Sequence, residues 1–167
     1  MEMNAIFTRT SVRTYTAQPV EPEKLERLLR AGMAAPSARN QQPWEFYVTT
    51  SRDRLRALSQ CTPYVGFVQN AAAAIVPCWR KTGLTAPDYV QIDLSAATEN
   101  ILLEAESLGL GGVWCGVAPG RDRMEAVRHA LGIPETLEPF AILSIGYPEK
   151  KAAQTDRFDP ARVHFVG

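Results

Sequence analysis

Apolar residues recur every three or four positions in several parts of this chain, a spacing typical of helices with one buried face. The first such helix is predicted to open at Glu21-Pro22, with proline in its first turn, and to end as Pro36 approaches. Its apolar or small face is formed by Leu25, Leu28, Leu29 and Gly32. A second, short helix is predicted over residues 52–60, with Ser51 as its N-terminal cap.

The longest helical pattern follows Asp88, which together with Gln91 imitates a capping box. Apolar residues occupy more than one of its faces, so we expect this helix to be central and buried, and the glycines at 109, 111 and 112 to end it. Its main apolar stripe is Leu94, Ala97, Ile101, Ala105 and Leu108, and Ile92, Ala96 and Leu103 widen it. A last helix is predicted over residues 122–131, capped by Gly132.

Three shorter apolar runs lie between these helices and predict strands. Residues 44–50 are rich in aromatic and β-branched side chains, and residues 140–145 read as a core strand. Residues 71–79 are predicted to form a buried strand in spite of four alanines. The pattern as a whole predicts an α+β architecture, with residues 1–167 forming one domain that is long enough for a substantial core.

Charge and composition exclude several classes of function. Eighteen basic residues balance eighteen acidic ones, so no overall field attracts nucleic acid or a membrane surface. The longest apolar run, residues 71–79, is about half the length of a membrane helix. Residues 1–4 lack the layout of a signal peptide, so we expect a cytoplasmic protein.

The three cysteines, Cys61, Cys78 and Cys115, are widely spaced and form no Cys-x-x-Cys pair. This pattern favours reduced, buried thiols over a disulfide framework or a metal site. Since the only histidines are His129 and His164, we expect no structural zinc.

A polar loop between Pro36 and Pro43, called here the proline loop, is a candidate binding segment. The two prolines stiffen it and disfavour helix, and its hydroxyl and amide groups can donate and accept hydrogen bonds. Trp44 then opens an apolar run, which holds the loop against a packed element. Such a loop suits a flat heteroaromatic ligand that needs edge hydrogen bonds and stacking.

A second candidate segment is Arg9–Arg13, called here the N-terminal strip. Residues 9, 11 and 13 alternate, so in an extended segment Arg9, Ser11 and Arg13 point the same way. Arginine binds phosphate through a planar fork, and its charge does not titrate away. Taken alone, the strip is more typical of a solvated basic stretch at the N-terminus.

The N-terminal strip and the proline loop, about thirty residues apart, together resemble the flavin-dependent nitroreductase family. Two further matches, residues 93–116 and 141–149, extend the resemblance in order from Phe7 to roughly Arg157. The resemblance implies a nitroreductase-like fold with a central mixed or antiparallel sheet flanked by helices. It also implies a two-fold homodimer with flavin mononucleotide (FMN) at the subunit interface.

The resemblance implies specific roles for the N-terminal strip. Arg9 and Ser11, with Thr10 between them, would approach the phosphate and ribityl chain, and Arg13 would approach the O2 edge of the flavin. The best matching phosphate cation near the C-terminus is Arg157, and weaker candidates are Lys150 and Lys151.

The resemblance also implies that the proline loop reaches a flavin held mainly by the other subunit, through Pro36, Ser37, Ala38 and Asn40. Ala38 replaces a frequent second serine, which removes a side-chain contact but is expected to leave backbone donors.

Gly111 and Gly112 have two possible roles. From the residues alone they favour a left-handed helix cap. The resemblance places their backbone amides against the N5 and O4 edge of the flavin, with Val113 and Trp114 near the ring.

The implied activity is that of an NAD(P)H-dependent flavin oxidoreductase. NADH or NADPH would deliver hydride to flavin N5, and a nitroaromatic, quinone or similar small aromatic acceptor would then take the electrons by a ping-pong mechanism. No side-chain general acid is implied. Two alternatives stay open: a relative with other flavin chemistry (dehalogenation, azoline oxidation or flavin breakdown), and a non-catalytic flavin-binding protein.

Two other kinds of site are not favoured. Glu99, Glu104 and Glu106 could suggest a carboxylate pair, but no histidine accompanies them in a metal-binding spacing, and we expect solvated or interface positions. The chain also lacks a Gly-x-Ser-x-Gly elbow for a serine nucleophile.

Overall fold

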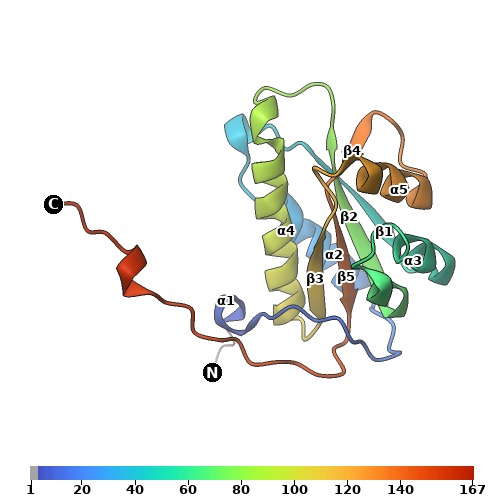
Figure 1. Cartoon of the computed structure of the whole chain (residues 1–167), viewed down its shortest axis with the longest axis horizontal. Coiled ribbons are helices and arrows are strands. Elements are labelled where there is room, and N and C mark those ends of the chain that lie inside the picture. The colour runs from blue at the N-terminus through green and yellow to red at the C-terminus, as the bar shows by residue number, and fades with distance from the viewer. Residues whose placement is uncertain (1–3) are drawn as a thin grey trace.

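The computed structural model describes residues 4–167, with a five-stranded antiparallel sheet at its centre (Figure 1). The described strands pair in the order β1-β2-β5-β3, and the short β4 pairs with β2. Their bounds are β1 Trp44–Thr49, β2 Ala73–Arg80, β3 Gly111–Gly116, β4 Leu137–Pro139 and β5 Ala141–Gly146.

Helices cover both faces of this sheet, with α2 and α4 on one face and α3 and α5 on the other (Figure 1). Their bounds are α1 Ala5–Thr8, α2 Pro22–Met33, α3 Arg52–Leu58, α4 Val90–Ser107 and α5 Arg121–Leu131. Single turns of 3₁₀ helix are η1 Ala38–Asn40, η2 Gly66–Asn70, η3 Pro87–Tyr89 and η4 Pro160–Arg162. No helix in residues 4–167 is long and apolar enough to cross a membrane.

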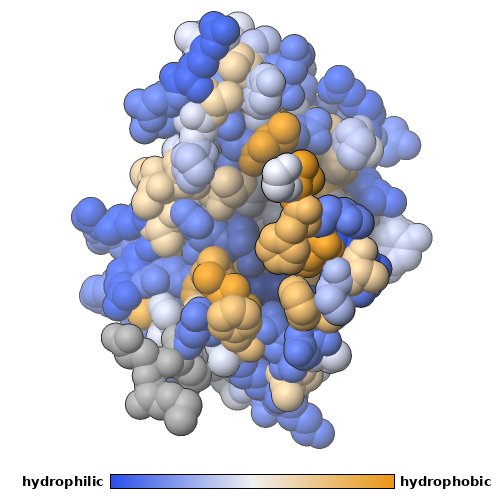
Figure 2. Space-filling view, turned by 90° about the vertical axis from the view of Figure 1, so that its left-hand side faces the viewer, coloured by the Kyte–Doolittle hydropathy of each residue, from blue (hydrophilic) through white to orange (hydrophobic). Residues whose placement is uncertain are grey.

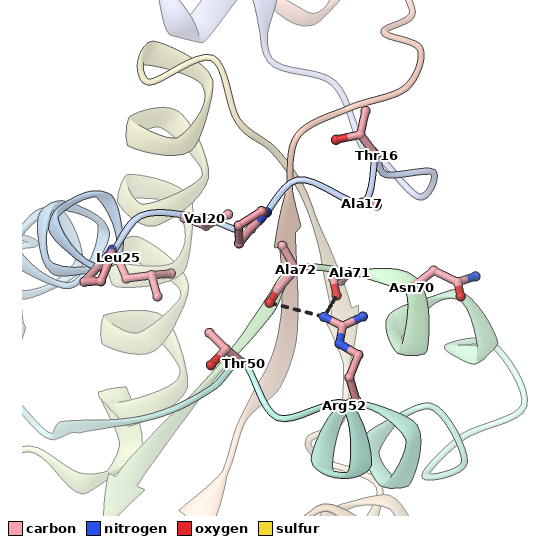
Figure 3. Close-up of a pocket in the computed structure, with 11 residues that line it drawn as sticks. Thr16, Ala17, Val20, Leu25, Thr50, Arg52, Asn70, Ala71 and Ala72 are labelled. Atoms are coloured by element: carbon pink, nitrogen blue, oxygen red, sulfur yellow. Dashed lines mark hydrogen bonds between the residues drawn. The ribbon is translucent and has the colours of Figure 1, made fainter.

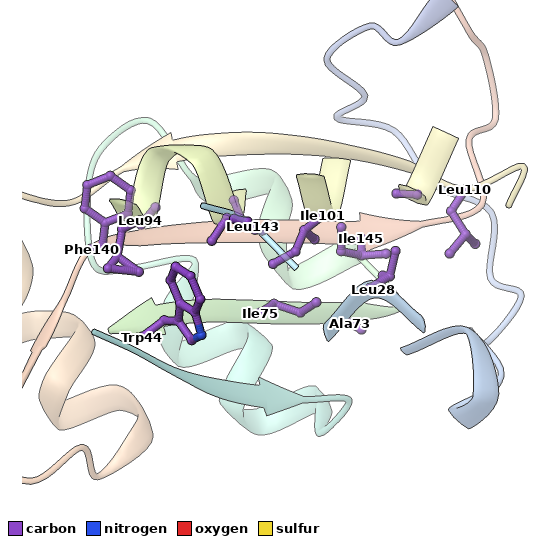
Figure 4. Packing of buried hydrophobic residues seen from close by; sticks show 14 of the residues in the cluster. Leu28, Trp44, Ala73, Ile75, Leu94, Ile101, Leu110, Phe140, Leu143 and Ile145 are labelled. Atoms are coloured by element: carbon purple, nitrogen blue, oxygen red, sulfur yellow. The ribbon is translucent and has the colours of Figure 1, made fainter. Parts of the chain in front are cut away.

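Strand β2 shows how the sheet separates two apolar layers. Ala73 and Ile75 face α2 and α4, whereas Ala74 and Val76 face α3 and α5, because successive side chains of a strand point to opposite faces. The first layer includes Leu28, Leu94, Ile101, Leu143 and Ile145 (Figure 4). The predicted α+β architecture is therefore confirmed, and α4 is the buried helix that its apolar stripe predicted.

Two predicted N-terminal caps have different outcomes: one is confirmed in position only, and the other is wrong. Ser51 does occupy the N-cap position of α3, but its side chain accepts no capping hydrogen bond. The N-cap of α4 is Tyr89 rather than Asp88, because Asp88 belongs to the preceding 3₁₀ turn. The predicted cap of α5 at Gly132 is confirmed by its left-handed backbone.

The glycines after α4 also differ from the predicted cap. Gly109 alone among them has the left-handed backbone, with φ of 73°, whereas Gly111 and Gly112 begin strand β3. A β-carbon added at Gly111 would lie 2.6 Å from the Val12 side chain, and one at Gly112 would lie 2.9 Å from Ile145. These two glycines therefore permit close packing, which composition alone does not reveal.

The N-terminal strip runs along the outer edge of β3. Ser11 forms a parallel bridge with Gly112, whose carbonyl accepts a hydrogen bond from the Val12 amide at 3.0 Å. The chain after β5 returns past the strip, where the Thr10 hydroxyl donates to the Ala152 carbonyl at 3.3 Å. The C-terminal segment, residues 150–167, then passes α1, and its last part extends away from the body of the fold (Figure 1).

Candidate functional site

Backbone pairing and one buried tyrosine set the orientation of the N-terminal strip. Val12 and Tyr15 are buried, whereas Ser11 and Arg13 are exposed, so the predicted alternation is present. The Tyr15 hydroxyl donates to the Val12 carbonyl at 2.6 Å and lies 2.7 Å from Ser144 Oγ on β5. Burial raises the pKa of Tyr15, so its hydroxyl stays protonated and can donate.

A hollow of about 230 Å³ opens beside the strip, and we call it the Arg13 hollow. The Arg13 guanidinium lies 6.0 Å from the centre of the Phe67 ring. Trp114, Cys115 and Gly116 of β3 form another wall. A β-carbon added at Gly116 would meet no heavy atom within 4 Å, so a flat ligand can approach the backbone there. The hollow thus combines a fixed cation, aromatic rings and bare backbone.

The three cysteines contribute no reactive group to the hollow. All three are free thiols, with Cys78 and Cys115 buried and Cys61 half-buried, as the sequence predicted. Burial raises the pKa of Cys115 to about 11, although Arg13 opposes this shift. The Cys115 thiol is therefore neutral near pH 7 and is a poor nucleophile.

The glutamates of α4 hold two of the predicted phosphate cations. Arg9 Nε lies 3.3 Å from Glu99 Oε1, and Lys151 Nζ pairs with Glu106 Oε1. The expected solvated or interface position is wrong for Glu106, whose side chain is only 2% exposed. A carboxylate so buried needs a paired cation, and Lys151 provides it.

Arg157 lies farther along the C-terminal segment. It is exposed and lines a shallow cavity of about 290 Å³ with Ile6, Phe7 and Phe158. The Gln154 side chain donates to the Ile6 carbonyl at 3.2 Å, which lays this part of the segment against α1. The structure therefore brings Lys151, rather than Arg157, to the end of α4 beside the strip.

The proline loop is held at the opposite end of α4 by Asp93. This buried carboxylate accepts the Ala38 amide at 2.8 Å through Oδ1 and the Gln41 side-chain amide at 2.7 Å through Oδ2. The backbone donor that Ala38 was expected to leave free is therefore already used. Asn40 is exposed, and its Oδ1 accepts from the Gln42 side chain at 3.1 Å.

The predicted site residues thus form two groups within one chain. The proline loop contacts α4 at Asp93, whereas Arg9 contacts it at Glu99 and Lys151 contacts it at Glu106. At 1.5 Å per residue, Glu106 lies about 20 Å beyond Asp93 along the helix axis, and Glu99 lies about halfway between them. Gly112, where the strip pairs with β3, lies just beyond the Glu106 end. Figure 1 shows the 3₁₀ turn of the loop beside the first turns of α4 and the strip beyond its last turn.

A larger cavity, of about 730 Å³, contains no predicted site residue. It lies between the segment that carries Thr16 and Val20 and the start of α3 (Figure 3). Its cation, Arg52, donates to the Ala71 carbonyl at 2.5 Å and to the Ala72 carbonyl at 3.4 Å. Because this guanidinium is already bound to backbone carbonyls, the cavity offers less for an anionic ligand than the Arg13 hollow does.

The sequence profile of the Nitroreductase family matches residues 6–62 and 54–147, and these matches include the proline loop and all of β3. The chain belongs to the nitroreductase family. A relative in Archaeoglobus fulgidus, named for NADH dehydrogenase and NAD(P)H nitroreductase activity, is 43% identical over 97% of this chain and 95% of its own.

Solved structures of this family share the fold. An FMN-dependent nitroreductase from Clostridium difficile R20291 superimposes with a TM-score of 0.90 at 32% identity, over 98% of each chain. The NADPH:FMN oxidoreductase from Vibrio harveyi, solved with NAD+, has a TM-score of 0.81 at 27% identity and covers 98% of this chain and 76% of its own.

Sequence reasoning missed Asp93, Gln41 and Tyr15 as residues that hold these segments in place. A usable signal was present for Asp93, because a carboxylate beside Leu94 on a helix with a wide apolar surface needs a polar partner. No local pattern identifies that partner, since Ala38 and Gln41 are more than fifty residues away in sequence.

Proposed function

We propose that the chain is an FMN-dependent oxidoreductase that takes hydride from NADH or NADPH and reduces a nitroaromatic, a quinone or a similar flat acceptor in a ping-pong cycle. Membership of the family and the relatives named for NAD(P)H nitroreductase and NADPH:FMN oxidoreductase activity support oxidoreductase activity with FMN and NAD(P)H. The acceptor, the ping-pong order and the residue assignments below are our inference.

The Arg13 hollow is the observation that carries this proposal. When bound, FMN supplies the two-electron chemistry. Arg13 would stabilise negative charge at the O2 edge through its positively charged guanidinium. Gly111 and Gly112 lie on the strand that lines the hollow, but Val12 and Ile145 cover their α-carbons. We therefore extend the proposed backbone contact along β3 to Gly116.

The phosphate would lie near the cations that pair with the second half of α4, at Glu99 and Glu106. Arg9 is the main proposed ligand, supported by Thr10 and Ser11 from the same strip. Lys151 is near because Glu106 holds it there. Arg157 would contact the phosphate from its position beside α1. Charge-assisted hydrogen bonds of this kind are stronger than neutral ones, so these cations should dominate cofactor retention.

We further propose that the working unit is a two-fold homodimer with FMN at its interface. The Arg13 hollow, at about 230 Å³, is smaller than the roughly 300–1,000 Å³ of ordinary ligand pockets, so a second surface is needed to enclose the cofactor. In a two-fold dimer, the proline loop of one copy, with Pro36, Ser37, Ala38 and Asn40, can cover the hollow of the other.

Exposed apolar side chains support such an interface. Phe7 on α1 is 72% exposed, Ile92 on α4 is 63% exposed and Phe158 in the C-terminal segment is 75% exposed. Figure 2 faces the left-hand side of Figure 1 and shows apolar side chains gathered near its centre. Large exposed apolar residues on neighbouring elements are typical of protein interfaces.

The test uses purified protein, titrated with FMN and then mixed anaerobically with NADH or NADPH and a panel of quinones and nitroaromatics. We expect a yellow dimer by light scattering, FMN rather than FAD, and turnover with at least one acceptor. Protein that shows no spectral shift with micromolar FMN would rule out the flavin proposal. FMN binding without reduction by either nucleotide would instead support the non-catalytic alternative.

A further inference from the structure

The turn inside the proline loop has an unusual backbone. Arg39, Asn40 and Gln42 have φ values of 52°, 51° and 45°, in the left-handed region. Asparagine tolerates this region, but arginine and glutamine adopt it much less often. Such a conformation persists where surrounding contacts hold it, and it is common at ligand sites.

Three polar side chains hold this turn from three directions. Asp93 of α4 binds the Ala38 amide and the Gln41 side chain, at 2.8 Å and 2.7 Å. The Gln41 amide also exchanges two hydrogen bonds of 2.9 Å with the backbone of Ala86, just before η3. Arg80 at the end of β2 donates to the Gln41 and Gln42 carbonyls, at 3.1 Å and 2.9 Å.

Asp93 and Gln41 stand out because both are almost completely buried. Asp93 is 4% exposed and Gln41 is 8% exposed. A buried carboxylate is costly unless hydrogen bonds satisfy its oxygens, and here each oxygen accepts one. Each of these bonds goes to the turn, so the cost of burying the charge is offset only while the turn keeps its shape.

We propose that Asp93 is a positioning residue for the flavin site. Through Gln41 and the Ala38 amide it fixes the strained turn, so that Ser37 and Asn40 are presented to the FMN held by a second copy. Asp93 itself touches no ligand. The inference rests on the proposed function, because the turn needs a ligand in order to have a binding role.

A purely structural role for Asp93 predicts a different outcome. The matched control for this role is Asn100. Its Nδ2 donates to the Ala31 carbonyl at 3.1 Å, so it also ties α4 to a segment distant in sequence. Asn100→Ala removes one such tether without touching the turn. If Asp93 only supports stability, variants at these two positions should affect the protein in the same way.

The experiment measures the FMN dissociation constant and the melting temperature of the FMN-free protein for the parent, Asp93→Asn and Asn100→Ala. Asp93→Asn keeps the size of the side chain, but one new amide donor would face the Gln41 amide donor. The substitution therefore disrupts the pair of hydrogen bonds that Asp93 accepts from Ala38 and Gln41, called here the Asp93 clamp. We expect FMN affinity to fall roughly tenfold to a hundredfold, the range for lost hydrogen bonds to a charged group. Asn100→Ala should leave FMN affinity unchanged.

A second variant covers the case in which Asp93→Asn fails to fold. Gln41→Ala breaks the same clamp from the loop side and should cause a similar loss of FMN affinity. Adding Gln41→Glu to Asp93→Asn restores one donor–acceptor pair and should recover part of that loss.

The outcomes separate this inference from the proposed function. Parent-like FMN affinity in both clamp variants would overturn the positioning role while leaving the flavin proposal intact. A loss of affinity that merely parallels the loss of melting temperature, in Asn100→Ala as well, would reduce Asp93 to a structural tether. A parent protein that binds no FMN would overturn both proposals.

Discussion

The N-terminal strip and the proline loop would contact the same cofactor, yet the fold holds them in opposite ways. The strip is regular: it adds to the edge of β3 by backbone pairing, and alternation leaves Ser11 and Arg13 exposed. The proline loop is irregular, and its left-handed residues depend on side chains from α4 and β2. Backbone pairing thus suffices for an extended segment, whereas a strained turn needs dedicated side-chain contacts.

This difference has a consequence for substitutions. In the strip, the side chains that would touch the ligand are distinct from the backbone groups that pair with β3, so side-chain contacts to the ligand can be removed without loss of the fold. In the proline loop, Ala38 and Gln41 lie within the turn and are also bonded to Asp93. Binding and local structure should therefore be coupled in the loop and separable in the strip.

The largest expected effect is on cofactor retention by the strip. Arg9→Ala should weaken FMN binding roughly tenfold to a hundredfold, since hydrogen bonds to charged groups contribute about 1.5–3 kcal/mol. Arg13→Ala should slow flavin reduction more than it weakens retention, because its proposed partner gains charge only on reduction. Fluorescence titration and stopped-flow reduction measure the two effects.

The control for these variants is Arg27→Ala. Arg27 also pairs with a glutamate of α4, with Arg27 Nη2 2.5 Å from Glu104 Oε1, but it lies on α2. We expect it to bind and react like the parent. If Arg9→Ala and Arg13→Ala do the same, the assignment of the strip is wrong.

A somewhat smaller effect is expected on stability, where substitutions of two glycines of β3 should differ. Gly111→Ala pushes a methyl group against Val12, and such overpacking costs about 1–3 kcal/mol of stability. Gly116→Ala meets no neighbour within 4 Å, so its stability should match that of the parent. Urea unfolding of both variants measures this. Equal stability losses would contradict the packing described for the strip.

The smallest effect concerns Tyr15, whose hydroxyl links the strip to β5. Tyr15→Phe removes the hydroxyl that contacts Val12 and Ser144, and should cost about 1 kcal/mol of unfolding free energy. FMN affinity should change little, because backbone pairing with Gly112 remains. A large loss of affinity without a loss of stability would instead place Tyr15 at the ligand.

The regular parts of this molecule could be predicted from the sequence, because local periodicity determines them. The helices at 22–33 and 90–107 and the strands at 44–49 and 141–146 agree with their patterns within a few residues. Strand β3 was missed because its glycines resemble a turn. Only the packing of Val12 against Gly111 shows why a strand needs them there.

The candidate site was predictable in its residues but not in its arrangement. Arg9–Arg13 and the proline loop carry recognisable side chains, so their chemistry could be inferred. The buried pair of Glu106 with Lys151 and the Asp93 clamp join residues more than forty positions apart, and local patterns do not report such contacts. The separation of the two groups along α4 likewise depends on the tertiary fold.

The most direct test of an interface-bound cofactor is complementation between two defective chains. One chain carries Arg9→Ala with Arg13→Ala, and the other carries Asn40→Ala with Asp93→Asn. Each is co-expressed with itself or with the other under two different tags, and FMN per dimer is measured after tandem purification. Because a two-fold dimer repeats its sites, the mixed dimer should combine both defects in one site and leave the other intact.

We predict that each variant alone retains little FMN and that the mixed dimer binds about one FMN with parent-like affinity. If the mixed dimer binds no more FMN than the homodimer of either variant, the strip and the proline loop do not share a cofactor across the interface.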